Sequence, residues 1–277
     1  MKEKSHIYGI LGSGISYTLS PAIFSLLFRK FKLNDGYFVF DCEKKNLKRF
    51  VDSAKLLGVS GFNVTMPFKN SIIRHLNSLD RESDTCQSVN LVISRRNGLK
   101  GYNTDIFGID SVFRDSGITS FSRKRILVIG AGGTGRTALT YFQKKKATDI
   151  TVINRNRKRL ELMLNDLGVT MGSRKLHSFH AACIKTSLED FRWDVILNAT
   201  PVPTEKIVSS KEIDSGTYIF EAAYSFSNRQ SVRSLTIHGG YDMLIYQALR
   251  SFEIMTGERV GDYSKMKRSI RRKLLTK

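Results

Sequence analysis

The chain has 277 residues, 41% of them hydrophobic, and a formal net charge of +20. This length suits two modest domains or one large one, and this apolar fraction supports a core, which excludes an intrinsically disordered chain. The charge attracts anions, a class that includes nucleic acids and membrane surfaces but also dinucleotides and carboxylate substrates.

The cysteines and the two ends of the chain indicate the cellular compartment and the partners that we expect. Cys42, Cys86 and Cys183 are far apart and odd in number, which argues against a disulfide framework. Met1 to Tyr8 lacks the apolar core of a signal peptide, and no apolar run reaches the roughly 20 residues of a membrane helix. We therefore expect a cytoplasmic protein with no membrane partner.

The basic run Lys265 to Lys277 lacks interleaved aromatic residues, so we expect a solvated helix end or a frayed tail rather than a nucleic-acid contact.

The first half of the chain alternates strand and helix patterns. The expected strands and helices are, in order, Ile7–Leu11, Ala22–Phe31 after Pro21, Tyr37–Phe40, Asn46–Leu57 before Gly58, and Gly61–Thr65. Val89–Ser94 and Leu99–Tyr102 have the pattern of a hairpin around the turn pair Asn97-Gly98. Alternating strands and helices indicate a mostly parallel sheet.

A sharper pattern begins at Arg125. A strand at Ile126–Ile129, a glycine loop, a helix from Arg136 to about Lys145 and a strand at Ile150–Ile153 form a βαβ unit. Two more strands and a last helix are expected at Val195–Leu197, Tyr218–Phe220 and Gly239–Gly257. The boundary between the two patterns falls near Asp105 to Lys124.

The glycine loop Gly130–Gly135 matches G-x-G-x-x-G between a strand and a helix. The first glycine permits a tight turn, the second lets the backbone approach a pyrophosphate, and the third permits close packing of helix on strand. The helix N-terminus then presents N–H groups to phosphates. The pattern predicts a dinucleotide site, and the alternative is an ordinary glycine-rich turn.

The strand after this loop ends in Asn154-Arg155-Asn156-Arg157-Lys158-Arg159. NAD-binding proteins usually carry an acidic residue here for the ribose hydroxyl, and this segment has none. A guanidinium can pair with a 2′-phosphate through two charge-assisted hydrogen bonds. We therefore predict NADP with Arg155 as its discriminator, while Lys158 and Arg159 can belong to a solvated helix start.

Three polar groups come before the glycine loop. Thr18 and Ser20 flank a helix start, which is either a carboxylate site or a plain N-cap. Lys69 and Asp105 each follow a predicted strand, and alone they would be an exposed lysine and a helix cap. Because the carboxyl ends of parallel strands meet at one edge, the two side chains can converge. A lysine beside a carboxylate can give a proton to a nascent alkoxide and stabilise its charge.

A metal site is the rival interpretation of another segment. His177, His180 and Cys183 are all potential zinc ligands. No fourth ligand lies nearby in the sequence, so we expect no metal and a helix or loop that carries surface imidazoles.

Taken in order from Gly9 to Gly257, these motifs resemble the shikimate dehydrogenase family. The matching segments are Thr18–Pro21 for S-x-S-P, Gly61–Lys69 for G-x-N-V-T-x-P-x-K, Val89–Leu91 for V-N-T, Asn103–Gly108 for N-T-D-x-x-G, Gly130–Arg136 for G-A-G-G-x-x-R, Asn154-Arg155 for N-R, Asn198–Pro201 for N-A-T-P and Gly240–Ala248 for G-x-x-M-L-x-x-Q-A. The resemblance implies an α/β fold with an N-terminal α/β substrate domain, residues 1–104, completed by C-terminal helices in residues 242–277. Between them, residues 105–241 would form a Rossmann-type doubly wound domain that binds NADP.

The resemblance also implies an activity and residue roles. The activity would be the reduction of 3-dehydroshikimate to shikimate, in chorismate and aromatic amino acid biosynthesis, with a possible homodimer and no nucleic-acid partner. Lys69 and Asp105 would serve the proton transfer. The substrate-binding residues would be Thr18 and Ser20 for the carboxylate, Thr65, Asn90 and Gln247 for hydroxyls, and Tyr224. The cofactor-binding residues would be Gly130, Ala131, Gly132, Gly133, Gly135, Arg136, Asn154, Arg155, Thr200, Gly240 and Met243, the last three near the nicotinamide or the hinge.

Some positions depart from the family pattern. Leu91 replaces a threonine, and Val202-Pro203-Thr204 replaces the usual Gly-Met. The segment Glu221-Ala222-Ala223-Tyr224 lacks the usual aspartate and the proline beyond the tyrosine. These changes leave open a paralogue that acts on quinate or another hydroxy acid. A nucleotide-binding regulator without catalysis is the third reading, and the retention of both Lys69 and Asp105 argues against it.

Overall fold

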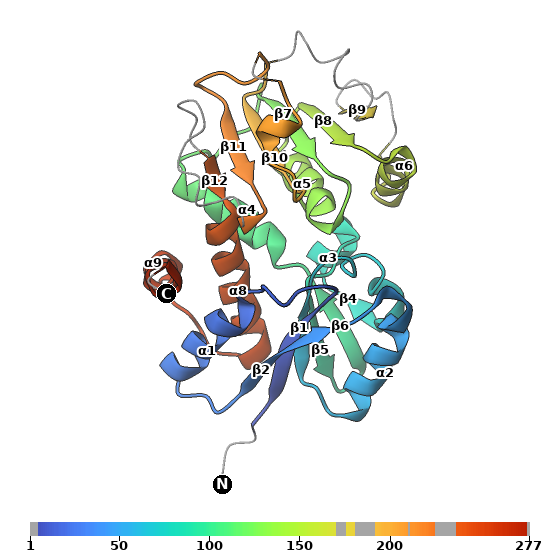
Figure 1. Cartoon of the computed structure of the whole chain (residues 1–277), viewed down its shortest axis with the longest axis vertical. Coiled ribbons are helices and arrows are strands. Elements are labelled where there is room, and N and C mark those ends of the chain that lie inside the picture. Colours follow the sequence, from blue (N-terminus) through green and yellow to red (C-terminus); the bar gives the residue numbers. More distant parts are fainter. Residues whose placement is uncertain (1–4, 170–175, 181–191, 210, 225–236, 276–277) are drawn as a thin grey trace. The chain divides into compact units, whose positions relative to one another are not determined.

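The computed structural model describes residues 5–169, 176–180, 192–209, 211–224 and 237–275. The chain forms two compact units, one of Met1–Phe107 with Ile245–Lys277 and one of Gly108–Leu244. Each unit has its own six-stranded sheet with helices packed on it (Figure 1). No helix in the described part of the chain combines the length and apolarity needed to cross a membrane.

The first unit contains a mixed sheet with the order β2-β1-β3-β5-β6-β4. Its strands are β1 (Ile7–Gly12), β2 (Gly36–Asp41), β3 (Gly61–Val64), β4 (Ser78–Leu79), β5 (Leu91–Arg95) and β6 (Gly98–Tyr102). Its helices are α1 (Ser20–Lys30), α2 (Leu47–Leu56), α3 (Arg81–Cys86), the start of α4 (Asp105–Asp115), most of α8 (Gly240–Thr256) and α9 (Tyr263–Leu275), with short 3₁₀ turns at Lys44–Asn46 and Ile73–His75. Because β5 runs antiparallel to both β3 and β6, the sheet is less parallel than the strand–helix alternation predicts.

The predicted hairpin is confirmed, although its turn is shifted by one residue. β5 and β6 pair antiparallel with Arg95 opposite Gly98, so Arg96 and Asn97 form the turn. Gly98 has φ of 106°, a conformation that other residues rarely adopt. The short elements β4 and α3 escape prediction because two and six residues are too few for a periodic pattern.

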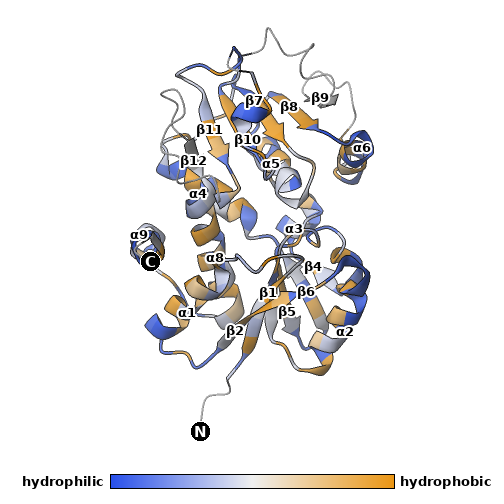
Figure 2. Ribbon diagram, in the orientation of Figure 1, coloured by the Kyte–Doolittle hydropathy of each residue, from blue (hydrophilic) through white to orange (hydrophobic). Residues whose placement is uncertain are grey.

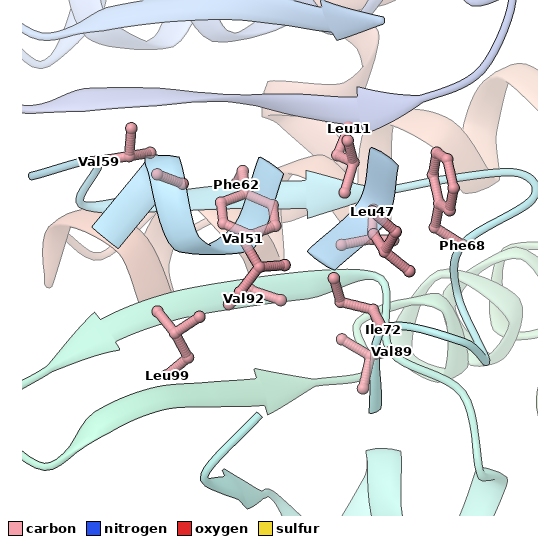
Figure 3. Close-up of a cluster of buried hydrophobic side chains, with 12 residues drawn as sticks. Leu11, Leu47, Val51, Val59, Phe62, Phe68, Ile72, Val89, Val92 and Leu99 are labelled. Carbon is pink, nitrogen blue, oxygen red and sulfur yellow. The ribbon is translucent and has the colours of Figure 1, made fainter. Parts of the chain in front are cut away.

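One face of the first sheet is covered by α2 (Figure 3). Leu47 and Val51 of α2 are buried against Leu11, Phe62 and Val92 of the sheet. Side chains alternate between the two faces of a strand, so the residues that neighbour Phe62 along β3 point to the opposite face. That face carries the polar site described below.

The basic C-terminal segment is a packed helix. α9 packs against α1, and its Met266 and Ile270 are 6% and 3% exposed. Lys265, Arg268 and Arg271–Lys273 are exposed, whereas Lys267 lies over the Tyr246 ring of α8. Figure 2 shows hydrophilic and hydrophobic residues together in α9. The frayed-tail alternative is therefore wrong for Tyr263–Leu275, and the solvated-helix alternative holds for the outer face only.

The second unit is an all-parallel doubly wound sheet, as predicted. Its order is β12-β11-β10-β7-β8-β9, which from the β9 edge is the Rossmann order 3-2-1-4-5-6. Its strands are β7 (Arg125–Ile129), β8 (Asp149–Asn154), β9 (Leu176–His180), β10 (Val195–Asn198), β11 (Tyr218–Glu221) and β12 (Ile237–Gly239). Its helices are the rest of α4, α5 (Gly133–Lys144), α6 (Arg157–Asp166), a 3₁₀ turn at Thr204–Lys206 and the first residues of α8. The strand order reverses between β7 and β10, the place where ligands bind in such sheets.

The helix or loop expected around His177 and His180 is wrong, because both residues belong to strand β9. Cys183 lies outside the described residues. Within the described residues, no group of three or more His, Cys, Asp or Glu side chains could hold a metal ion.

Candidate active site

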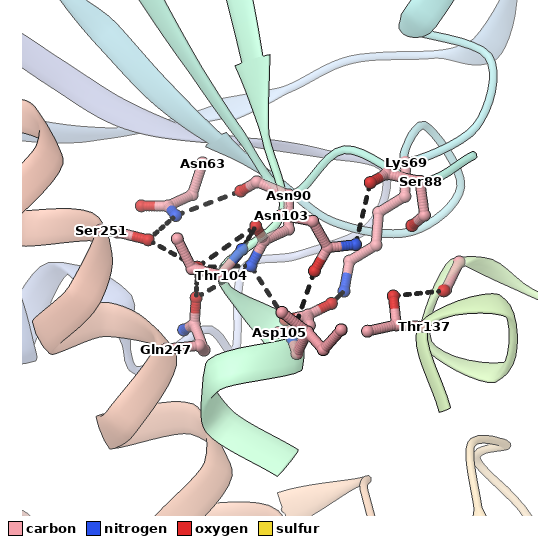
Figure 4. Close-up of polar contacts among 12 residues, drawn as sticks. Asn63, Lys69, Ser88, Asn90, Asn103, Thr104, Asp105, Thr137, Gln247 and Ser251 are labelled. Atoms are coloured by element: carbon pink, nitrogen blue, oxygen red, sulfur yellow. Dashed lines mark hydrogen bonds and ion pairs between the residues drawn. The ribbon is translucent and has the colours of Figure 1, made fainter. Parts of the chain in front are cut away.

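Two charged side chains meet at one edge of the first sheet. Lys69 follows β3, Asp105 follows β6, and Lys69 Nζ lies 2.5 Å from Asp105 Oδ2 (Figure 4). β3 and β6 run in the same direction because both oppose β5, so their carboxyl ends share this edge. The side chains are 14% and 5% exposed. The predicted convergence is confirmed, and the interpretation of Lys69 as an ordinary exposed lysine is wrong.

Asp105 is available to Lys69 because another residue caps the helix. Asn103 Oδ1 accepts a hydrogen bond from Ile106 N in the first turn of α4, at 3.2 Å. Asp105 Oδ1 instead accepts from Asn90 Nδ2 at 2.9 Å. Each carboxylate oxygen of Asp105 thus has its own donor, which fixes the plane of the carboxylate toward Lys69.

Amide and hydroxyl groups gather beside this pair. Asn90 lies just before β5, is 2% exposed, and accepts from Thr104 N at 2.7 Å through its Oδ1. Its Nδ2 also lies 2.8 Å from Thr104 Oγ1 and 3.3 Å from Gln247 Oε1 on α8. The structure therefore brings Asn90, Gln247, Lys69 and Asp105 together in the first unit, four residues that sequence reasoning selected.

The other hydroxyl groups lie at the start of α1 and the end of β3. Ser20 is 3% exposed, and its Oγ lies 3.3 Å from Thr18 Oγ1. The N-cap residue of α1 is Leu19, so the plain N-cap reading of the two hydroxyls is wrong. Thr65 packs against Gly12. A Cβ on Gly12 would lie 2.7 Å from the Thr65 methyl group.

In the second unit, the glycine loop has the geometry of a phosphate site. Gly130 has φ of +106°, and a Cβ there would lie 2.8 Å from the Thr200 methyl. A Cβ on Gly135 would lie 1.9 Å from Gly130 O, so only glycine permits this helix–strand approach. A Cβ on Gly132 would meet only Arg159, at 3.4 Å, among the described residues, which leaves room for a phosphate above the loop. The loop residues therefore fit a bound pyrophosphate.

The end of β8 holds this loop and carries the cationic segment. Asn154 Oδ1 accepts a hydrogen bond from Ala131 N at 3.2 Å. Arg155 is exposed directly after it. Arg159 lies in the first turn of α6 with its guanidinium beside Gly132, so it belongs to the surroundings of the glycine loop.

The motif implies that Arg136 contacts the cofactor, whereas in the structure it pairs with Asp166. It is 5% exposed, and its Nη2 lies 2.7 Å from Asp166 Oδ2 at the end of α6. Its guanidinium joins α5 to α6 and is shielded from solvent. We therefore leave Arg136 out of the proposed cofactor contacts, while Gly133 keeps its place as the first residue of α5.

The altered loop after β10 is folded around Asn198. Asn198 Oδ1 accepts from Thr200 N and Oγ1 at 3.0 and 2.8 Å, and its Nδ2 donates to Val202 O at 2.7 Å. The carboxyl of Glu221, 1% exposed, accepts from Thr204 N at 2.8 Å. Burial raises the pKa of the Glu221 carboxyl. Glu221 thus anchors the Val202-Pro203-Thr204 segment.

Three further predicted residues lie near the start of α8 or just after β11. Tyr224 is half-buried with its ring 5.9 Å from that of Tyr241. Gly240 is the first residue of α8, and Met243 is 4% exposed. All three lie in the second unit.

Sequence reasoning missed several residues that support the site. Asn63 and Thr104 stand inside quoted motifs, and Ser251 lies four residues after Gln247 on the same helix. Residues four apart share a helix face, so this spacing was the available signal for Ser251. Arg159 also follows Arg155 by four residues, but Arg155 precedes α6, so helical spacing gives no signal for Arg159.

Comparisons with known proteins cover both units. Residues 10–92 match the shikimate dehydrogenase substrate binding domain, residues 114–219 the family described as shikimate / quinate 5-dehydrogenase, and residues 240–271 the shikimate 5'-dehydrogenase C-terminal domain. A shikimate dehydrogenase (NADP(+)) of Methanococcus vannielii is 31% identical over 279 residues, with 97% of each chain covered. The structure of shikimate dehydrogenase from Aquifex aeolicus matches with a TM-score of 0.81 and 27% identity, covering 98% of this chain and 99% of that one. A shikimate dehydrogenase solved in complex with NADP+ matches with a TM-score of 0.78 and 27% identity, covering 97% and 96%.

Proposed function

Because this chain belongs to the shikimate dehydrogenase family, we propose that it catalyses the reversible NADPH-dependent reduction of 3-dehydroshikimate to shikimate. This reaction is a step of chorismate and aromatic amino acid biosynthesis. The observation that carries the proposal is the shielded Lys69–Asp105 pair, 2.5 Å apart and surrounded by amide and hydroxyl groups. Such a pair suits proton transfer to an oxygen of a polyhydroxylated ring.

Each unit has its own part in this proposal. The first unit would bind the substrate, with Thr18 and Ser20 at the carboxylate and Thr65, Asn90 and Gln247 at the ring hydroxyls. The second unit would bind NADP through its glycine loop and through Asn154, Arg155, Thr200, Gly240 and Met243. Tyr224 would be a further substrate contact. The room above Gly132 and the cations beside it support the phosphate contacts.

When bound, NADPH supplies the hydride that the carbonyl carbon receives. The residues of the chain handle the proton. The Lys69 ammonium stabilises the negative charge that grows on the carbonyl oxygen and donates a proton to it, and Lys69 then regains a proton from water. Asp105 keeps the ammonium oriented through the 2.5 Å contact. In the reverse direction, neutral Lys69 takes the proton of the ring hydroxyl as the hydride leaves.

The 2′-phosphate contact rests on charge and position. Arg155 is exposed directly after β8, and Arg159, in the first turn of α6, lies beside Gly132 of the loop. Two guanidinium groups beside a helix N-terminus favour a phosphate over a free ribose hydroxyl. This arrangement supports NADP rather than NAD.

The substitution at Leu91 places a buried aliphatic side chain on the sheet face that carries the polar site. Leu91 is 0% exposed and pairs with Asn63 and Tyr102, so its side chain points to the same face as that of Asn63. Steady-state rates with shikimate and quinate, each with NADP and NAD, test the proposal through the absorbance of the reduced cofactor. Shikimate with NADP is expected to give the highest kcat/KM. A higher value with quinate, or no turnover with either substrate, would refute it.

We also infer a cytoplasmic enzyme that works without a nucleic-acid or membrane partner, and we keep the homodimer as an open prediction. The spacing of the cysteines supports the reducing compartment. Sedimentation equilibrium measures the oligomeric state directly.

A further inference from the structure

A second layer of hydrogen bonds lies behind the groups proposed to bind the substrate. Its centre is Ser251 on α8, which is 0% exposed and lies one helical turn after Gln247. Ser251 Oγ lies 3.0 Å from Asn63 Nδ2 and 2.9 Å from Thr104 Oγ1 (Figure 4). Ser251 therefore joins β3, the start of α4 and α8, three elements that are distant in the sequence.

The hydrogen-bond partners of Asn63 fix the direction of its carboxamide. Asn63 Oδ1 accepts from the Tyr37 hydroxyl at 2.8 Å. Asn63 Nδ2 donates to the carbonyl oxygen of Asn90 at 3.1 Å, an oxygen that can only accept. The second hydrogen of Nδ2 then points to Ser251 Oγ, so the serine oxygen is an acceptor in this contact.

This assignment determines where the remaining protons point. With its oxygen accepting from Asn63, Ser251 donates its hydroxyl hydrogen to Thr104 Oγ1. Thr104 Oγ1 also accepts from Asn90 Nδ2 at 2.8 Å, so its own hydrogen points to Asn90 Oδ1 at 3.2 Å or Gln247 Oε1 at 3.5 Å. The donors thus run in one direction, from Tyr37 toward the carboxamides of Asn90 and Gln247.

Tyr37 connects the other end of the site to the same layer. Its ring stacks on Phe24 of α1 with centroids 4.1 Å apart, and its hydroxyl donates to Asn63 Oδ1 at 2.8 Å. Burial raises the pKa of the Tyr37 phenol well above its usual range, so the hydroxyl stays protonated and can donate to Asn63. Tyr37 therefore packs on α1, the helix that carries Ser20, and belongs to the hydrogen-bonded layer through Asn63.

We propose that Ser251 is a positioning residue that sets the orientation of Asn90 and Gln247 for the substrate, with Tyr37 as the first donor of the chain. This inference rests on the proposed function, because it gives the two carboxamides their task. Ser251 would act through Thr104 and would not contact the substrate. Its loss should disturb substrate affinity more than cofactor affinity, since every member of the network lies in the first unit.

The test compares Ser251→Ala with a matched control in the full-length protein. Ser83→Ala is the control, because Ser83 is also 0% exposed and its hydroxyl lies 3.1 Å from two backbone carbonyl oxygens, those of Asp80 and Gly101. Ser251→Ala leaves a buried Asn63 hydrogen without its acceptor, which should raise the KM for shikimate about 5- to 50-fold and change the KM for NADP less than about twofold. Ser83→Ala should leave both KM values unchanged while lowering the melting temperature by a similar amount.

Two further measurements test the positioning role of Ser251. Tyr37→Phe removes the first donor and keeps the ring, so it should raise the KM for shikimate in the same direction as Ser251→Ala. Shikimate titrated calorimetrically into the protein without cofactor should bind more weakly to Ser251→Ala than to the wild type. Equal changes in the KM for shikimate and the KM for NADP would overturn the positioning role. If the wild type is active and Ser251→Ala binds shikimate as tightly as the wild type does, the positioning role is also overturned. A wild-type protein that neither oxidises nor binds shikimate would overturn the proposed function and this inference together.

Discussion

Replacement of Lys69 by methionine removes the ammonium and keeps most of the side-chain volume. In the structure this ammonium lies 2.5 Å from Asp105 Oδ2, and only 14% of the lysine side chain is exposed. Loss of a positioned acid–base group typically lowers the rate by about 10²- to 10⁴-fold, and we expect kcat to fall within that range. The Kd for NADP should stay unchanged, because Lys69 belongs to the first unit and the glycine loop to the second.

Asp105→Asn tests the partner of the same contact. Asn90 donates to Oδ1 of Asp105, so an asparagine that keeps its carbonyl oxygen toward Asn90 turns its amide group toward Lys69. Two donors would then face each other, and Lys69 would lose its orientation. We expect kcat to fall about as far as in Lys69→Met, and the double variant to be little worse than the worse single one, because residues that act as a unit are not additive.

Stability should follow a different pattern from activity. Removal of one partner from a buried ion pair costs up to about 3–5 kcal/mol, and less here because water reaches Lys69. Lys69→Met leaves the Asp105 carboxylate with Asn90 as a donor but without its countercharge, so the melting temperature should drop. The double variant removes both charges and should recover part of that loss while remaining inactive. The exposed pair Lys48–Asp52, with side chains 75% and 55% exposed, is the control and should affect neither quantity when neutralised.

The assay is NADP-dependent oxidation of shikimate, with thermal unfolding of each variant measured in parallel. A Lys69→Met protein with wild-type kcat would refute the proton-transfer role outright. A double variant that regained activity together with stability would show that the pair serves folding alone.

Three further outcomes are expected. Arg155→Ala should raise the KM for NADP roughly 10- to 100-fold and leave the KM for NAD nearly unchanged; equal losses in steady-state titrations of both cofactors would exclude Arg155 as the discriminator. Burial raises the pKa of the Glu221 carboxyl, so its contribution to stability is complete below the unfolded-state pKa and is lost as pH rises through the folded-state pKa. The melting temperature of the wild type should therefore fall relative to Glu221→Gln as pH rises from about 4 to about 8, and a constant difference would contradict this. Truncation after Ser264 should destabilise the protein in a thermal melt, because it removes the buried Met266 and Ile270; an unchanged melting temperature would show that α9 adds nothing to the fold.

The glycine loop could be predicted because each of its requirements is local. Gly130 needs a positive φ and Gly135 needs contact with Gly130 O, and both are met within six residues of chain. The convergence of Lys69 and Asp105 was predicted from a premise that holds only in part. The first sheet is mixed, yet β3 and β6 point the same way because β5 separates them.

Other features could not be predicted from local sequence because their partners are remote. The motif marks Arg136, but Asp166 determines where its guanidinium points. In the basic run at the C-terminus, the buried Met266 and Ile270 stand among many cationic residues, so composition alone indicates a tail. The strand around His177 extends an existing sheet, and pairing with β8 rather than its own pattern defines it.

The hydrogen bonds of Ser251 with Asn63 and Thr104 are the clearest case of contacts that local sequence does not predict. Asn63 and Ser251 are separated by 188 positions, and a folded unit of the chain lies between them. α8 nevertheless belongs to the first unit, since the Tyr8 hydroxyl donates to Met255 O at 2.9 Å and Phe31 packs on Phe252. The groups proposed to bind the substrate therefore come from both ends of the chain and depend on the return of α8 to the first sheet. A motif can mark Gln247 as a residue that faces the substrate, but only this return explains why the residue one turn later is a buried serine.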